Sequence, residues 1–72
     1  MMAREYQKLR ARIVELFGSQ GAFSKEIGLS EQSLTAKLNG KRQFSQTDIV
    51  RWSNALKIEA DEVGEYFFAY KL

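Results

Sequence analysis

Side chains with hydrogen-bonding groups crowd one short segment, residues 31–37, which the sequence predicts to be helical. The polar members are Glu31, Gln32, Ser33, Thr35 and Lys37. Only Leu34 and Leu38, four residues apart, form an apolar stripe that could anchor this helix. Most of its surface would therefore stay exposed, which suits a helix that enters a DNA groove and equally describes any surface helix.

Catalytic and metal chemistry is poorly represented elsewhere in the 72 residues. The sequence has no cysteine and no histidine, which excludes cysteine nucleophiles, Ser-His-Asp triads and the usual zinc sites. The acidic residues near the end are Glu59, Asp61, Glu62 and Glu65. They lack the ordered, glycine-containing loop of a calcium site, so a solvated acidic face explains them better. We therefore expect no enzyme, no metal and no cofactor.

Four helices are predicted from apolar spacing and from capping residues. The first covers residues 4–17, with an apolar stripe of Tyr6, Leu9, Ile13, Leu16 and Phe17. Serines that can cap helix starts precede the next three, which cover residues 20–27, 31–39 and 46–56. In the second helix Ala22 is predicted to lie where two helices cross. Residues 45–48 form a capping box, and Phe44 before it is predicted to point inward.

A fifth, short helix over residues 60–67 is predicted less firmly, because Gly64 in it costs about 1 kcal/mol against alanine. The last residues form an aromatic tail, residues 66–72, which could continue as helix or as a short strand. The tail either closes the small core or forms a dimer or partner surface. The candidate surface residues are Tyr66, Phe68, Tyr70 and Leu72.

Together these elements predict a compact all-α fold of five helices in a single domain, residues 1–72. Two short helices joined by a tight turn at Gly28 and Leu29 make residues 19–40 a predicted helix-turn-helix. No apolar run is long enough to span a bilayer, so we expect a cytoplasmic protein without membrane contact.

The formal net charge of +2 is unevenly distributed. Residues 1–58 carry ten Lys and Arg against five Asp and Glu, whereas residues 59–72 carry one against four. The excess of positive charge in residues 1–58 suits binding to a polyanion, and the acidic residues within 59–72 would face away from that polyanion. The alternative is a solvated surface of mixed sign.

A family resemblance rests on Gln20, Phe23, residues 27–30 (IGLS), Leu34 and residues 39–41 (NGK). In these positions the sequence resembles the lambda-repressor/Cro-type (XRE-like) helix-turn-helix regulators of bacteria and phages, over about residues 6–67. The run RARIVELFGSQGAFSKEIGLSEQSLTAKLNGK with the later GEYFF also looks like small phage proteins encoded beside a repressor. These include Cro-like proteins and the modulator-of-repression antirepressors of lactococcal temperate phages.

The resemblance implies that one helix reads base edges. Its base-reading residues would be Glu31, Gln32, Ser33, Thr35 and Ala36. Gln32 could bond adenine in a bidentate way, and Glu31 could accept from the amino group of cytosine. Thr35 and Ala36 could meet a thymine methyl group. The alternative for all five is a solvated polar face.

The resemblance also implies contacts to the DNA backbone. The residues concerned are Ser19, Gln20, Lys37, Asn39, Lys41 and Arg42. Gln20 would hold a phosphate at a helix N-terminus, which attracts anions, although a plain helix-start residue is the alternative. Asn39 has a structural alternative too, since Asn-Gly commonly closes a helix.

Two functions follow. The first is a Cro-like transcriptional regulator of a phage lysogenic/lytic switch that binds operator DNA, as a dimer, in the cytoplasm of a bacterial host, with no small-molecule substrate. The second is an antirepressor that binds the phage repressor and masks its DNA-binding surface. The helix at residues 31–39 lacks arginine, so the commonest guanine contact is missing. That departure makes a protein partner more plausible.

Overall fold

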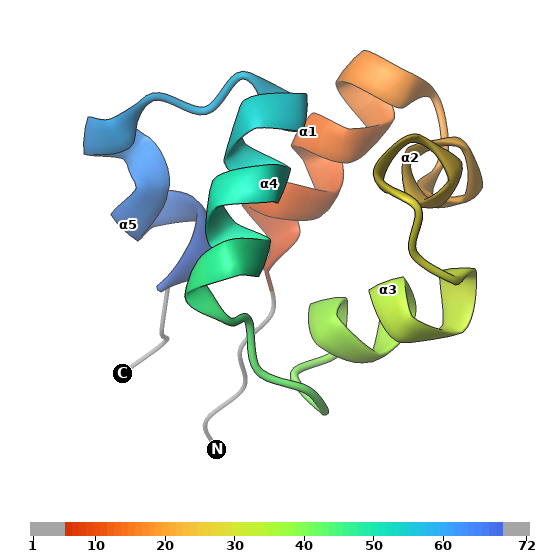
Figure 1. Ribbon diagram of the computed structural model, residues 1–72. Coiled ribbons are helices and arrows are strands. Elements are labelled where there is room, and N and C mark those ends of the chain that lie inside the picture. The colour runs from red at the N-terminus through yellow and green to blue at the C-terminus, as the bar shows by residue number, and fades with distance from the viewer. Residues whose placement is uncertain (1–5, 69–72) are drawn as a thin grey trace.

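Five α-helices make up most of the described part of the chain, residues 6–68, in the computed structural model (Figure 1). They are α1 (Gln7–Phe17), α2 (Gln20–Ile27), α3 (Glu31–Leu38), α4 (Gln46–Leu56) and α5 (Val63–Phe67). A single 3₁₀ turn, η1 (Ala60–Glu62), leads into α5. No strand occurs in residues 6–68. The predicted all-α, five-helix fold is therefore confirmed.

Three serines begin three of the helices, as the sequence predicts. The side-chain oxygens of Ser19, Ser30 and Ser45 accept hydrogen bonds from backbone N–H groups three residues later, at 3.0–3.1 Å. Ser45 is also half of a capping box, because Asp48 Oδ2 accepts from the Ser45 N–H at 2.9 Å. Each cap satisfies donors that the first turn of a helix leaves unpaired.

Left-handed backbone ends two of the helices. Gly28, with φ 69°, ends α2 and turns the chain into α3. Lys57, with φ 57°, does the same for α4, although a side chain in this conformation is disfavoured. The turn at Gly28 sets α3 across the end of α2, as Figure 1 shows.

The core lies where the five α-helices meet. Its buried members are Tyr6, Leu9, Ile13, Phe23, Ile27, Leu34, Leu38, Trp52, Leu56, Ile58, Tyr66 and Phe67. Phe44 points inward, as predicted, and packs edge-on against Trp52 and Phe67 with ring centroids 4.8 and 5.1 Å apart. Edge-to-face packing of this kind stabilises the fold beyond the contribution of burying the rings.

Several predicted details differ. Tyr6 has φ 46°, so α1 begins at Gln7 rather than at residue 4. Leu16 is 40% exposed and does not belong to the core stripe of α1. Ala22 is exposed and does not lie at a helix crossing. Asn39 is the cap after α3 rather than its last residue.

The predicted fifth helix is a composite of η1 and α5, which ends at Phe67. Phe68 follows as its C-cap. The predicted continuation of the tail, with Tyr70 and Leu72, lies outside the described residues.

Candidate functional site

The exposed face of α3 brings together most of the predicted base-reading residues. A shallow hollow of about 510 Å³ is lined by Glu31, Gln32, Thr35, Ala36, Asn39 and Lys41. Ser33 does not line it: its hydroxyl accepts a hydrogen bond from the Ser30 hydroxyl at 3.0 Å. The hollow is open and carries polar side chains, so it suits a flat partner surface better than an enclosed small molecule.

The N-terminus of α2 faces a carboxylate of the chain itself. A Cβ placed on Gly21 would lie 3.5 Å from Glu31 Oε1, so the Glu31 side chain covers the first turn of α2. Helix N-termini favour negative charge. Ser19 and Gln20 lie at this same end, and a DNA phosphate there would meet the Glu31 carboxylate.

Lys37 is not available for the predicted phosphate contact. Its side chain is buried, and Nζ lies 2.7 Å from Asp48 Oδ2 and 3.2 Å from the carbonyl oxygen of Gln43. The ion pair therefore ties α3 to the start of α4. A lysine ammonium usually reaches solvent while its aliphatic chain lies along the surface, but here the whole Lys37 side chain is largely buried.

Asp48 is held as a carboxylate at this contact. Burial by itself would raise the pKa of its carboxyl, but hydrogen bonds from Lys37 and Ser45 outweigh burial and lower it. The residue therefore completes both the capping box of α4 and the ion pair to α3.

Asn39 takes the structural role that the sequence left open. Its Oδ1 accepts a hydrogen bond from Arg10 Nη2 at 2.7 Å, and the same guanidinium nitrogen donates to the Leu38 carbonyl at 3.0 Å. Arg10 thus caps the C-terminus of α3 from α1. Lys41 and Arg42 follow in an exposed loop and remain available to a partner.

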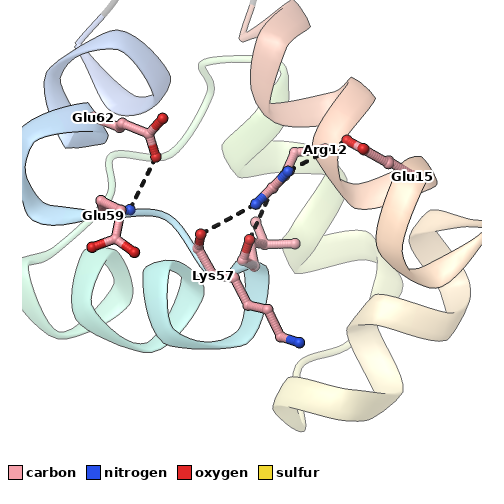
Figure 2. A network of polar contacts seen from close by, with 6 residues as sticks. Arg12, Glu15, Lys57, Glu59 and Glu62 are labelled. Carbon is pink, nitrogen blue, oxygen red and sulfur yellow. Dashed lines mark hydrogen bonds and ion pairs between the residues drawn. The ribbon is translucent and has the colours of Figure 1, made fainter.

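A second arginine of α1 caps α4 in the same way. Figure 2 shows the Arg12 guanidinium turned toward the end of α4. Its Nε donates to the Leu56 carbonyl at 2.9 Å and its Nη2 to the Lys57 carbonyl at 3.2 Å. Cations favour helix C-termini. A more distant contact, 3.5 Å, reaches Glu15.

Two further cations contact groups on other helices. Arg51 on α4 donates to the carbonyl oxygen of Ile27 at the end of α2, and Lys8 on α1 pairs with Glu65 on α5. Sequence reasoning missed these roles, because the partners lie 24 to 57 positions away along the chain. Within residues 6–68, the exposed cations without such a partner are Lys25, Lys41, Arg42 and Lys57.

An apolar groove lies between α4 and the end of α5. It has a volume of about 690 Å³, and its apolar lining consists of Ile49, Val50, Val63 and Phe68. Val50 and Phe68 are 59% and 55% exposed. The sequence predicts Phe68 at a partner surface but does not predict Val50 there. Val50 faces away from the core, although other residues of α4 are buried in the core.

Tyr66 is a correction to the predicted partner surface. It is 8% exposed and belongs to the core, because the short α5 turns Tyr66 and Phe67 toward α1 and α4. Tyr70 and Leu72 lie outside the described residues.

Residues 6–68 contain neither a metal-binding group nor a membrane-spanning helix. In this range no group of three or more acidic, histidine or cysteine side chains is arranged to hold a metal ion. No helix there is long and apolar enough to cross a membrane.

Comparison with known proteins finds a similar solved structure and a matching family model. Its fold is similar to the solution structure of the modulator of repression (MOR) of the temperate bacteriophage TP901-1 from Lactococcus lactis, with a TM-score of 0.82 and 30% identity. The match covers 92% of this chain and 89% of that one. Comparison with curated proteins finds no significant match. Membership of the lambda-repressor/Cro-type family stays a prediction. The family model that matches, over residues 2–70, is described as "Protein of unknown function (DUF739)", and the chain belongs to that family.

Proposed function

We propose that the chain is a phage modulator of repression that acts by binding the phage repressor and masking its DNA-binding surface. The observation that carries this proposal is the similarity, along nearly the whole chain, to the modulator of repression of a lactococcal phage. Such a protein would act in the cytoplasm of the bacterial host, where repressor and operator meet. The function needs no catalysis and no cofactor.

The use of positive charge in the fold supports a protein partner over DNA. Three of the ten cations in residues 1–58, Arg10, Arg12 and Lys37, contact carbonyl or carboxylate oxygens inside the molecule, and Lys37 is one of the predicted phosphate contacts. DNA affinity depends on cations that neutralise phosphates. The basic balance counted along residues 1–58 therefore overstates what the surface offers to a polyanion.

The test is binding to the repressor encoded in the same phage genome. We expect the two purified proteins to co-elute in size-exclusion chromatography at micromolar concentration, and added chain to release the repressor from labelled operator DNA. Two separate peaks, with operator binding unchanged, would count against the proposal.

DNA binding is a second candidate, favoured by Lys41 and Arg42 beside the polar face of α3. It predicts operator binding by the chain alone. With the few free cations near that face, the slope of log K against log salt should be no steeper than about −3. Fluorescence anisotropy in a salt series measures it, and absence of binding at low salt would rule this candidate out.

A further inference from the structure

We infer that the groove between α4 and α5 is the surface on which the repressor docks, with its basic DNA-contacting face around an apolar side chain that enters the groove. This inference rests on the proposed function and assigns it a surface. It places the contact away from the polar face of α3, which the DNA-binding hypothesis uses.

The groove has the composition of an interface centre. Four of the seven residues that line its volume of about 690 Å³ are apolar, Ile49, Val50, Val63 and Phe68, and Gln46, Thr47 and Arg51 complete the lining. Binding energy concentrates where apolar anchors fill such pockets and exclude water. The hollow on α3, in contrast, is lined almost entirely by polar side chains and offers no comparable anchor.

Charge next to the groove selects the kind of partner. Val63 follows directly on η1, and residues 58–68 contain no lysine or arginine. The acidic residues of this stretch are Glu59, Asp61, Glu62 and Glu65. Only Glu65 is offset by an ion pair, with Lys8. The one cation lining the groove is Arg51, which keeps its positive charge while it donates to the Ile27 carbonyl on α2; the acidic residues of the stretch outnumber it.

A DNA-contacting protein surface is basic, because it must neutralise phosphates. Such a surface complements the acidic stretch, whereas a second copy of this chain would bring two acidic stretches together. Like charges facing each other across an interface disfavour association. The observations therefore favour the repressor over self-association at this groove.

The experiment compares two matched substitutions by isothermal titration of the full chain into the repressor. Val50→Lys adds a cation in the groove, and Val14→Lys makes the same change at a valine of α1 that is similarly exposed, 52% against 59%. We expect Val50→Lys to raise the Kd at least about 10-fold, and Val14→Lys to change it less than about 2-fold. Circular dichroism checks that both variants fold.

A charge reversal tests the acidic stretch separately. Asp61→Lys should slow association with the repressor by about 3- to 10-fold at low salt, with a smaller effect at high salt because ions screen the charges. Glu26→Lys, the same type of reversal on α2, is the control and should leave association nearly unchanged.

The outcomes distinguish failure of the proposed function from failure of the groove assignment. If the unmodified chain does not bind the repressor, the proposed function fails. If it binds and Val50→Lys binds equally well, while Gln32→Lys on α3 weakens binding, the function stands and the groove assignment is wrong. If light scattering shows a dimer that Val50→Lys dissociates, the groove is a self-interface and the inference is overturned.

Discussion

The Lys37–Asp48 ion pair removes the Lys37 ammonium from the exposed face of α3. Both side chains are largely covered, with 11% and 19% exposure, whereas the Lys8–Glu65 pair is 51% and 61% exposed. Ion pairs in water contribute little, and removing one partner of a covered pair leaves the other charge without compensation. The two pairs therefore provide a matched comparison within one small protein.

Asp48→Asn should destabilise the fold by about 2 kcal/mol, because it leaves the Lys37 ammonium without its counterion and weakens the capping box. Glu65→Gln should cost less than about 0.5 kcal/mol, since its pair is exposed. Urea denaturation of the two variants measures the difference. Equal losses would mean that the covered pair has no special role.

Acid should remove the contribution of Asp48. The pKa of its carboxyl is lowered from the ordinary value of 3.8, so its stabilising effect is complete above that value and is lost as the pH falls through the lower folded value. The stability difference between the unmodified chain and Asp48→Asn should therefore be constant from pH 7 to about pH 5 and shrink below about pH 4. Urea titrations at several pH values test this, and a difference that grows in acid would contradict it.

At the scale of elements, α1 holds two helix ends that it does not adjoin in sequence. Arg10 contacts the last carbonyl of α3, and Arg12 those at the end of α4. Carbonyls at a helix C-terminus have no partner within the helix. The two arginines therefore join α1 to α3 and α4 by polar contacts, in addition to the apolar stripe of Leu9 and Ile13.

Arg12→Met should cost about 1–2 kcal/mol, because it keeps the apolar stem and removes the donors to the end of α4. Arg12→Lys should recover only part of that loss, since an ammonium cannot reproduce the two-pronged geometry of a guanidinium. Thermal melts followed by circular dichroism give the order. As a control, Arg42→Met in the exposed loop should stay within about 0.5 kcal/mol of the unmodified chain. If Arg12→Met behaves like this control, the capping contact is not significant.

Local signals made the helices predictable, and long-range contacts made the surface unpredictable. Ser30 and Gly28 specify the boundary between α2 and α3 by their own chemistry, and α4 was predicted with its observed ends. The use of Lys37 depends on Asp48, which the turn after α3 brings close in space. Burial of Tyr66 depends on how the short α5 settles on α1. The ion pair of Lys37 could not be read from spacing, whereas burial of Tyr66 was one of the alternatives that the sequence left open. The members of the candidate site were therefore predicted, but which of them remain exposed was not.

At the scale of the whole molecule, the core is organised around Trp52. This residue is 1% exposed and contacts the rings of Phe23 and Phe44, which come from α2 and from the loop before α4. Helices this short are only marginally stable in isolation. Their stability in the folded chain comes from the shared core.

Trp52 is the sole tryptophan, so its fluorescence should report global unfolding. We expect the fluorescence and the far-ultraviolet circular dichroism transitions in urea to coincide, as small single domains usually unfold in one step. A helical signal that persists after the fluorescence has changed would show instead that some helices outlast the core.

The two arginines of α1 also have a consequence for the time course of synthesis. Arg10 and Arg12 are made early, yet the carbonyls that they cap lie 28 to 45 positions later. At about 5–20 residues per second, the first helix waits several seconds for the groups that complete its contacts. The polar contacts that join α1 to α3 and α4 can therefore form only after Leu38 and Lys57 have been synthesised, seconds after α1 itself.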